Sequence, residues 1–191
     1  MLSLRFLFIV SLTAASTVFG QGLPPEWETR QLAESLVTTT QQMLPLLEQV
    51  KPEDWVKNGA SSGYVKQLEG IKKGAGYLGT SAKLFSQNPQ KLPPALDTYL
   101  RAQWLEMQVG SLEQGVRKYQ NQTLADQINA ASVANSRNRG LLQQYLLDLA
   151  AYRETEMSVM SQEAQTCRAA VTRPTATRPT SVVKPKEPVK Q

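Results

Sequence analysis

The sequence predicts an all-α fold, an up-down four-helix bundle whose long fourth helix is straight or bent, followed by a disordered carboxy-terminal tail. In four segments, apolar residues recur at spacings of three and four. Glycine, proline and asparagine interrupt this pattern at 52–63, 88–94 and 121–123. Alternating runs rich in Val, Ile and Thr, which are typical of strands, are missing from 21–170.

The first expected helix begins at Pro24 and Pro25, because proline is favourable in a first helical turn. Glu26 and Glu28 complement the positive end of the helix dipole. Pro45 predicts a kink. The apolar stripe consists of Leu32, Leu36, Met43, Leu47 and Val50.

The second expected helix, 62–85, has the most regular stripe of the chain: Tyr64, Leu68, Ile71, Ala75, Leu78, Ala82 and Phe85. It also holds Gly70, Gly74, Gly76 and Gly79. Each glycine inside a helix lowers helix stability by up to about 1 kcal/mol relative to alanine, so we expect some structural or functional reason for glycine at these positions. We favour close approach of a neighbouring helix; the alternative is a groove floor that admits a ligand.

The third expected helix, 93–119, carries two apolar rows. One row is Ala102, Leu105, Val109, Leu112, Val116 and Tyr119, and the adjacent row is Leu96, Leu100, Trp104 and Met107. Together the rows predict a wide apolar face directed into the bundle interior.

The fourth expected helix, 124–168, would reach about 65 Å if continuous, against about 40 Å for the others, at 1.5 Å per residue. It should therefore break or overhang the bundle. The polar run 135–140 is the place where we expect a bend, although its residues also permit an uninterrupted helix.

The amino terminus resembles a cleavable secretory signal. Arg5 precedes an apolar run that begins at Phe6, and Gly20 supplies the small residue expected before a cleavage site. We therefore expect residues 1–20 to be the signal, 21–170 the bundle and 171–191 a basic tail rich in Pro and Thr. No second run is long and apolar enough for a transmembrane segment.

The single cysteine, Cys167, cannot form an internal disulfide, whereas small extracellular eukaryotic domains usually contain several. A bacterial protein, periplasmic or secreted, is therefore the expectation. Cys167 either packs as a small apolar residue or forms an intermolecular disulfide in a homodimer.

Charge is distributed unevenly along the chain. Residues 21–170 hold 15 Lys and Arg against 15 Asp and Glu, whereas the tail holds five basic residues and one acidic residue. A nucleic-acid-binding protein concentrates positive charge on its folded surface, so nucleic acid is not an expected partner. The tail could associate weakly with acidic envelope polymers or serve as a spacer.

The composition narrows the possible chemistry. The chain has no histidine and one cysteine, which excludes Ser-His-Asp and Cys-His nucleophiles, His-ligated haem and the usual zinc and iron-sulfur sites. We therefore predict no catalytic residue, no metal site and no cofactor, and we expect a protein that is not an enzyme.

Three aromatic residues are candidate anchors for a ligand or partner: Trp55, Trp104 and Tyr77. For Trp55, the alternative is a packing role in closing one end of the bundle.

Three segments, 50–56, 115–121 and 145–150, resemble uncharacterised exported helical proteins of bacteria. This resemblance runs from about Leu44 to Arg168 and implies an exported bundle without an assigned activity. The leading hypothesis is a non-enzymatic bundle that binds a protein partner or envelope component. The alternative is a small-ligand protein with an apolar, aromatic-lined pocket where the glycine-rich helix meets Trp104.

We predict that the purified protein is predominantly helical, because every folded segment has helical periodicity, and that it keeps its fold when metal ions are chelated, because the sequence holds no cluster of metal-ligand residues. Circular dichroism with and without a chelator tests this. A strand spectrum, or unfolding on chelation, would contradict it.

Overall fold

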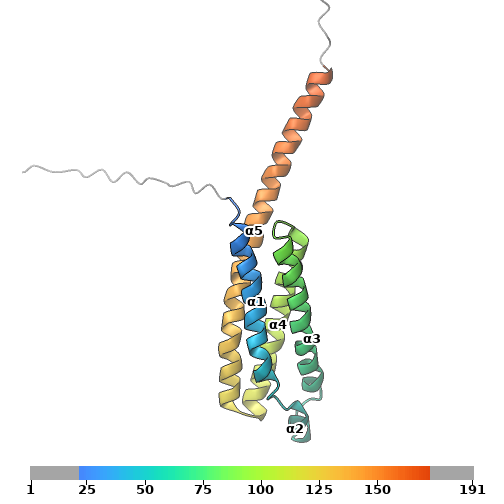
Figure 1. Ribbon diagram of the computed structural model, residues 1–191. Helices are drawn as coiled ribbons and strands as arrows, with labels where there is room; N and C mark the ends of the chain where they lie inside the picture. The colour runs from blue at the N-terminus through green and yellow to red at the C-terminus, as the bar shows by residue number, and fades with distance from the viewer. Residues whose placement is uncertain (1–21, 173–191) are drawn as a thin grey trace, which may run out of the picture. The chain divides into compact units, whose positions relative to one another are not determined.

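The computed structural model describes residues 22–172, and helices account for nearly all of them (Figure 1). The described residues contain no strand, so the all-α prediction is confirmed. No described helix is long and apolar enough to cross a membrane. In chain order the helices are α1 (Glu26–Leu47), α2 (Pro52–Lys57), α3 (Gly63–Gln87), α4 (Leu92–Tyr119) and α5 (Gln122–Thr172).

The chain divides into two compact units, Met1–Tyr152 and Arg153–Gln191. In the described part of the first unit, α1, α3, α4 and the first part of α5 lie side by side and alternate in direction (Figure 1). All four contribute fully buried side chains to one core, including Leu36, Phe85, Leu112 and Leu149.

The described residues form five helices, so the prediction of four was incomplete. The additional helix, α2, lies in the connection 52–63, where glycine and proline had predicted an interruption between helices. Pro52 occupies the first turn of α2, and the side chain of Trp55 in the same helix is buried. The helix ends at Lys57 and Asn58 caps it. Gly59 follows with a φ of 89°, which only glycine adopts readily, and its amide donates to the carbonyl of Val56.

The predicted helix boundaries hold to within a few residues. α4 begins at Leu92, so its two prolines fall in the first turn, where they remove no helical hydrogen bond. α5 begins at Gln122, and the Asn121 side chain caps it by accepting a hydrogen bond of 3.2 Å from the amide of Leu124. α1 continues through Pro45.

α5 is continuous through the polar run where a bend was considered. Three side chains of the run, those of Asn135, Ser136 and Arg139, form hydrogen bonds with residues of other helices. Thr39 of α1 donates its hydroxyl hydrogen to the side-chain oxygen of Asn135, and Arg139 donates to Glu106 of α4. Ser136 also donates to Glu106, at 2.8 Å. Because these hydrogen bonds join the run to α1 and α4, the run need not interrupt α5, although the buried side-chain nitrogen of Asn135 has no hydrogen-bond partner among the described residues.

The second unit is described only over residues 153–172, which continue α5 to Thr172. Nearly all of its side chains are exposed. Residues 171 and 172, assigned to the tail from sequence, are still helical. The expected signal, 1–20, and the rest of the tail, 173–191, lie outside the described residues.

We predict that Leu68→Ala and Leu78→Ala each lower the free energy of unfolding by roughly 2–5 kcal/mol, because both leucines are buried in the core. Lys72→Ala should cost less than about 1 kcal/mol, since Lys72 is half-buried at the surface and makes an ion pair of 2.9 Å with the exposed Glu48. Denaturant titrations of the three variants provide the measurement. Equal small losses at all three positions would show that the stripe does not carry the core.

Candidate functional site

The interior of the bundle leaves little room for a ligand, and the larger hollows open at its surface. A hollow between the helices, lined by Met43, Leu78, Leu105 and Asn135 among others, has a volume of about 10 Å³. That is about the space of one water molecule. Surface hollows of about 390–620 Å³ lie along the seams between helices.

The hollow that brings together two of the predicted anchors lies between α3 and α4 and has a volume of about 520 Å³. We call it the α3/α4 groove. Tyr77 of α3 and Trp104 of α4 both line it, so the structure places these two candidates in one site. The full lining is Gly70, Lys73, Gly74, Tyr77, Asp97, Leu100, Arg101 and Trp104.

The indole of Trp104 lies over Gly74. A Cβ atom at position 74 would come within 2.3 Å of Trp104 Cζ3, a distance that real Cβ atoms do not show, whereas at Gly70 the nearest approach would be 3.9 Å. Gly76 and Gly79 would meet nothing within 4 Å. Gly74 therefore has a steric reason to be glycine, and its neighbour is an aromatic side chain rather than a helix backbone.

A charged and aromatic cluster forms one rim of the groove. Arg101 donates a hydrogen bond of 2.8 Å to Asp97 and lies 5.7 Å from the centre of the Tyr77 ring. The hydrogen bond to Asp97 is the main reason that the pKa of Arg101 lies above its ordinary value. This fixed cation holds the exposed Tyr77 ring at the edge of the groove by a cation–π contact.

The second apolar row of α4 is exposed, contrary to the prediction that both rows face the interior. Leu100 is 52% exposed and Met107 is 60% exposed, whereas Leu105 and Val109 of the first row are buried. We call Leu96, Leu100, Trp104 and Met107 the apolar row. Each of them is more than one third exposed. A row of large apolar side chains at a protein surface is typical of an interaction site.

The groove continues along α3 toward its first turn. A neighbouring hollow of about 510 Å³ shares Gly70 and Trp104 with it and reaches Gly63 and Lys66. Trp104 therefore stands at the junction of two hollows. From Gly63 to Tyr77 they extend along roughly 20 Å of helix, at 1.5 Å per residue.

The third candidate anchor, Trp55, lies in the core and is 1% exposed. Its indole N–H donates to the Gln120 side chain at 3.2 Å, and its ring packs edge-on against Tyr64 at 5.3 Å. It also stacks on Tyr119. This placement corresponds to the packing role, and Trp55 offers no surface to a ligand in the structure.

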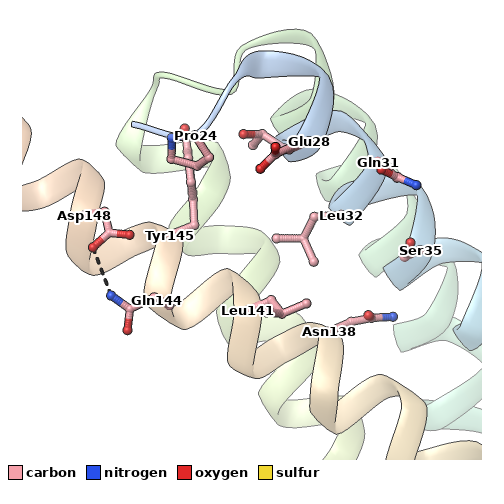
Figure 2. A pocket seen from close by; sticks show the side chains of 11 residues that line it. Pro24, Glu28, Gln31, Leu32, Ser35, Asn138, Leu141, Gln144, Tyr145 and Asp148 are labelled. Atoms are coloured by element: carbon pink, nitrogen blue, oxygen red, sulfur yellow. Dashed lines mark hydrogen bonds between the residues drawn. The ribbon is translucent and has the colours of Figure 1, made fainter. Parts of the chain in front are cut away.

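A second hollow, of about 390 Å³, lies between α1 and the bundle part of α5 (Figure 2). Leu32 of α1 and Leu141 of α5 point into it, and Tyr145 closes one side (Figure 2). The Tyr145 hydroxyl donates to the carbonyl of Pro89, which ties α5 to the connection between α3 and α4. This hollow was not predicted from the sequence, and the position of Leu141 became clear only from the structure, where Leu142 is buried and Leu141 is 56% exposed.

Within residues 22–172, no three His, Cys, Asp or Glu side chains gather in a way that could hold a metal ion. Comparisons of the chain with known protein families, curated proteins and solved structures find no match. The resemblance to exported bacterial helical proteins stays an expectation from the sequence.

We predict that Gly74→Ala pushes the Trp104 indole out of the groove, because the new methyl group would occupy its position. Gly76→Ala is the matched control, since it adds the same methyl group to the same helix in open space. The control should stabilise the protein by up to about 1 kcal/mol, and Gly74→Ala should be about 1–2 kcal/mol less stable than the control.

Tryptophan fluorescence and denaturant titration test this pair. The emission of Gly74→Ala should shift to longer wavelength as Trp104 enters water, and that of Gly76→Ala should not change. Identical spectra and stabilities for the two variants would show that Trp104 does not rest on Gly74 in solution.

Proposed function

We propose that this protein is a binding module that docks an amphipathic helix of a partner protein on its α3/α4 face, by which we mean the surface formed by the α3/α4 groove and the exposed apolar row of α4. The observation that carries the proposal is the exposed apolar row of α4, in which the Trp104 indole packs against Gly74 of α3. The filled core favours a surface partner over an enclosed small ligand. The proposal assigns the protein no reaction.

The spacing of the apolar row favours a helical partner. Its members follow one another at intervals of four, four and three residues, which makes a continuous ridge along a helix. Ridges of this kind pack against the grooves of a facing helix. A partner helix would complete the packing with apolar residues at the same spacing.

The charges around the groove favour an acidic flank on the partner helix. Lys66 and Lys73 line the two joined hollows, and the acidic side chain in their lining, Asp97, is already paired with Arg101. Charges at the rim of an interface set orientation and association rate more than affinity. An acidic flank would therefore orient the helix, and the apolar row would supply the affinity.

The start of the sequence supports a site of action outside the cytoplasm, because residues 1–20 have the order of a secretory signal. We therefore propose that the partner is another exported protein or an envelope component with an exposed helix.

Leu100→Glu tests the docking face, because it places a charge in the middle of the apolar row. Leu147→Glu is the matched control: Leu147 is also an exposed helical leucine, and it lines neither groove. We expect a partner protein that co-purifies with the wild type to be lost with Leu100→Glu and kept with Leu147→Glu. Quantitative mass spectrometry measures this, and circular dichroism checks that both variants fold.

Three results would contradict the proposal. Retention of every co-purifying protein by Leu100→Glu would remove the α3/α4 face as the docking site. Loss with Leu141→Glu alone would move the site to the groove between α1 and α5, which Leu141 lines. A small molecule released from the wild type and not from Leu100→Glu would favour the small-ligand alternative.

A further inference from the structure

The part of α5 in the second unit carries an apolar stripe that no described side chain covers. Met157 is 72% exposed, Met160 is 68% exposed and Cys167 is exposed as well. Large apolar residues in a row on a helix surface need a partner to leave water. The stripe consists of Met157, Met160, Ala164, Cys167 and Val171.

The spacing of this stripe is that of a coiled coil. Its members are separated by three, four, three and four residues, which places them at alternating a and d positions of a seven-residue repeat. Most positions outside the stripe are polar: Ser158, Ser161, Gln162, Gln165 and Thr166. A narrow stripe with a polar remainder is typical of a two-stranded seam rather than of a bundle interior.

We propose that the stripe pairs with the same stripe of a second copy of this chain, as a parallel, in-register, two-stranded coiled coil. The charged residues beside the stripe indicate that the partner helix is a second copy of α5 and that the two helices run parallel. Glu163 occupies the g position of one repeat and Arg168 occupies the e position of the next, five residues later. In a parallel pair this separation brings Glu163 beside Arg168 of the partner subunit, on both sides of the seam.

An antiparallel pair would lose this complementarity, because g positions then face g positions and Glu163 meets its own copy. The parallel register also aligns the two Cys167 side chains at the same level of the seam. The residues of the stripe are small or flexible and span only two repeats, so the noncovalent contact between the two helices is weak. A disulfide between the two Cys167 side chains would stabilise the pair.

The disulfide forms by thiol–disulfide exchange with a disulfide oxidant. The two Cys167 thiols lose two protons and two electrons and form one S–S bond, while one molecule of oxidised glutathione takes them up and becomes two thiols. This pairing is independent of the α3/α4 face, which lies in the first unit.

The experiment incubates the purified full chain with oxidised glutathione and measures the dimer on non-reducing gels. We expect a dimer for the wild type and its complete loss for Cys167→Ser. Met160→Glu, on the stripe, should abolish most of the dimer, whereas Val159→Glu should not. Val159 is the matched control because it is a neighbouring exposed apolar residue outside the stripe.

A charge exchange tests the direction of pairing. Glu163→Arg alone and Arg168→Glu alone should each lower the yield of dimer, and the double variant should restore it. A monomer under oxidising conditions would overturn the proposal. Equal dimer yields for Met160→Glu and Val159→Glu would also overturn it, since the crosslink would then come from random collision of exposed thiols. Failure of the double variant to restore the yield would refute the parallel register.

Discussion

The structure of the first unit depends on one geometric constraint: an α-helix can turn only one face toward a shared core. Each long helix has more apolar residues than that face holds. On α4, Leu105 and Val109 take the interior, and Leu100 and Met107 are left in solvent. An apolar surface therefore arises from the packing itself, and its position is set by which row the core selects.

The same constraint explains the contact between Trp104 and α3. The indole on the outer row of α4 lies so close to α3 that a Cβ atom at position 74 would collide with it, and Gly74 has no such atom. The close approach buries part of the ring and leaves the rest exposed. Glycine at position 74 thus lowers the stability of α3 and leaves the space in which the Trp104 indole packs.

α5 shows how one helix can serve two environments. Within the first unit its interior residues are large, such as Ile128, Leu142 and Leu149, and they are fully buried. Beyond Tyr152 the apolar stripe of α5 is made of Met, Ala, Cys and Val, and these residues are exposed. Arg153 and Glu156 interrupt the apolar stripe between the two parts, and beyond them flexible or small residues replace Ile and Leu. A packed core requires the first composition, and a narrow seam between two helices tolerates the second.

By itself the sequence determined the helical class, the breaks between helices and the buried stripe of α3, because these depend on periodicity and on local turn chemistry. It also indicated Trp104 as a residue that meets the glycine-rich helix. Only the tertiary structure decided that Trp55 is buried, that the second row of α4 is exposed and that α5 passes its polar run unbroken. Those outcomes depend on the side chains that other parts of the chain place against each helix, such as Gln120 beside Trp55 and Thr39 beside Asn135. The periodicity of a single helix does not contain that information, because it does not say which helices become neighbours.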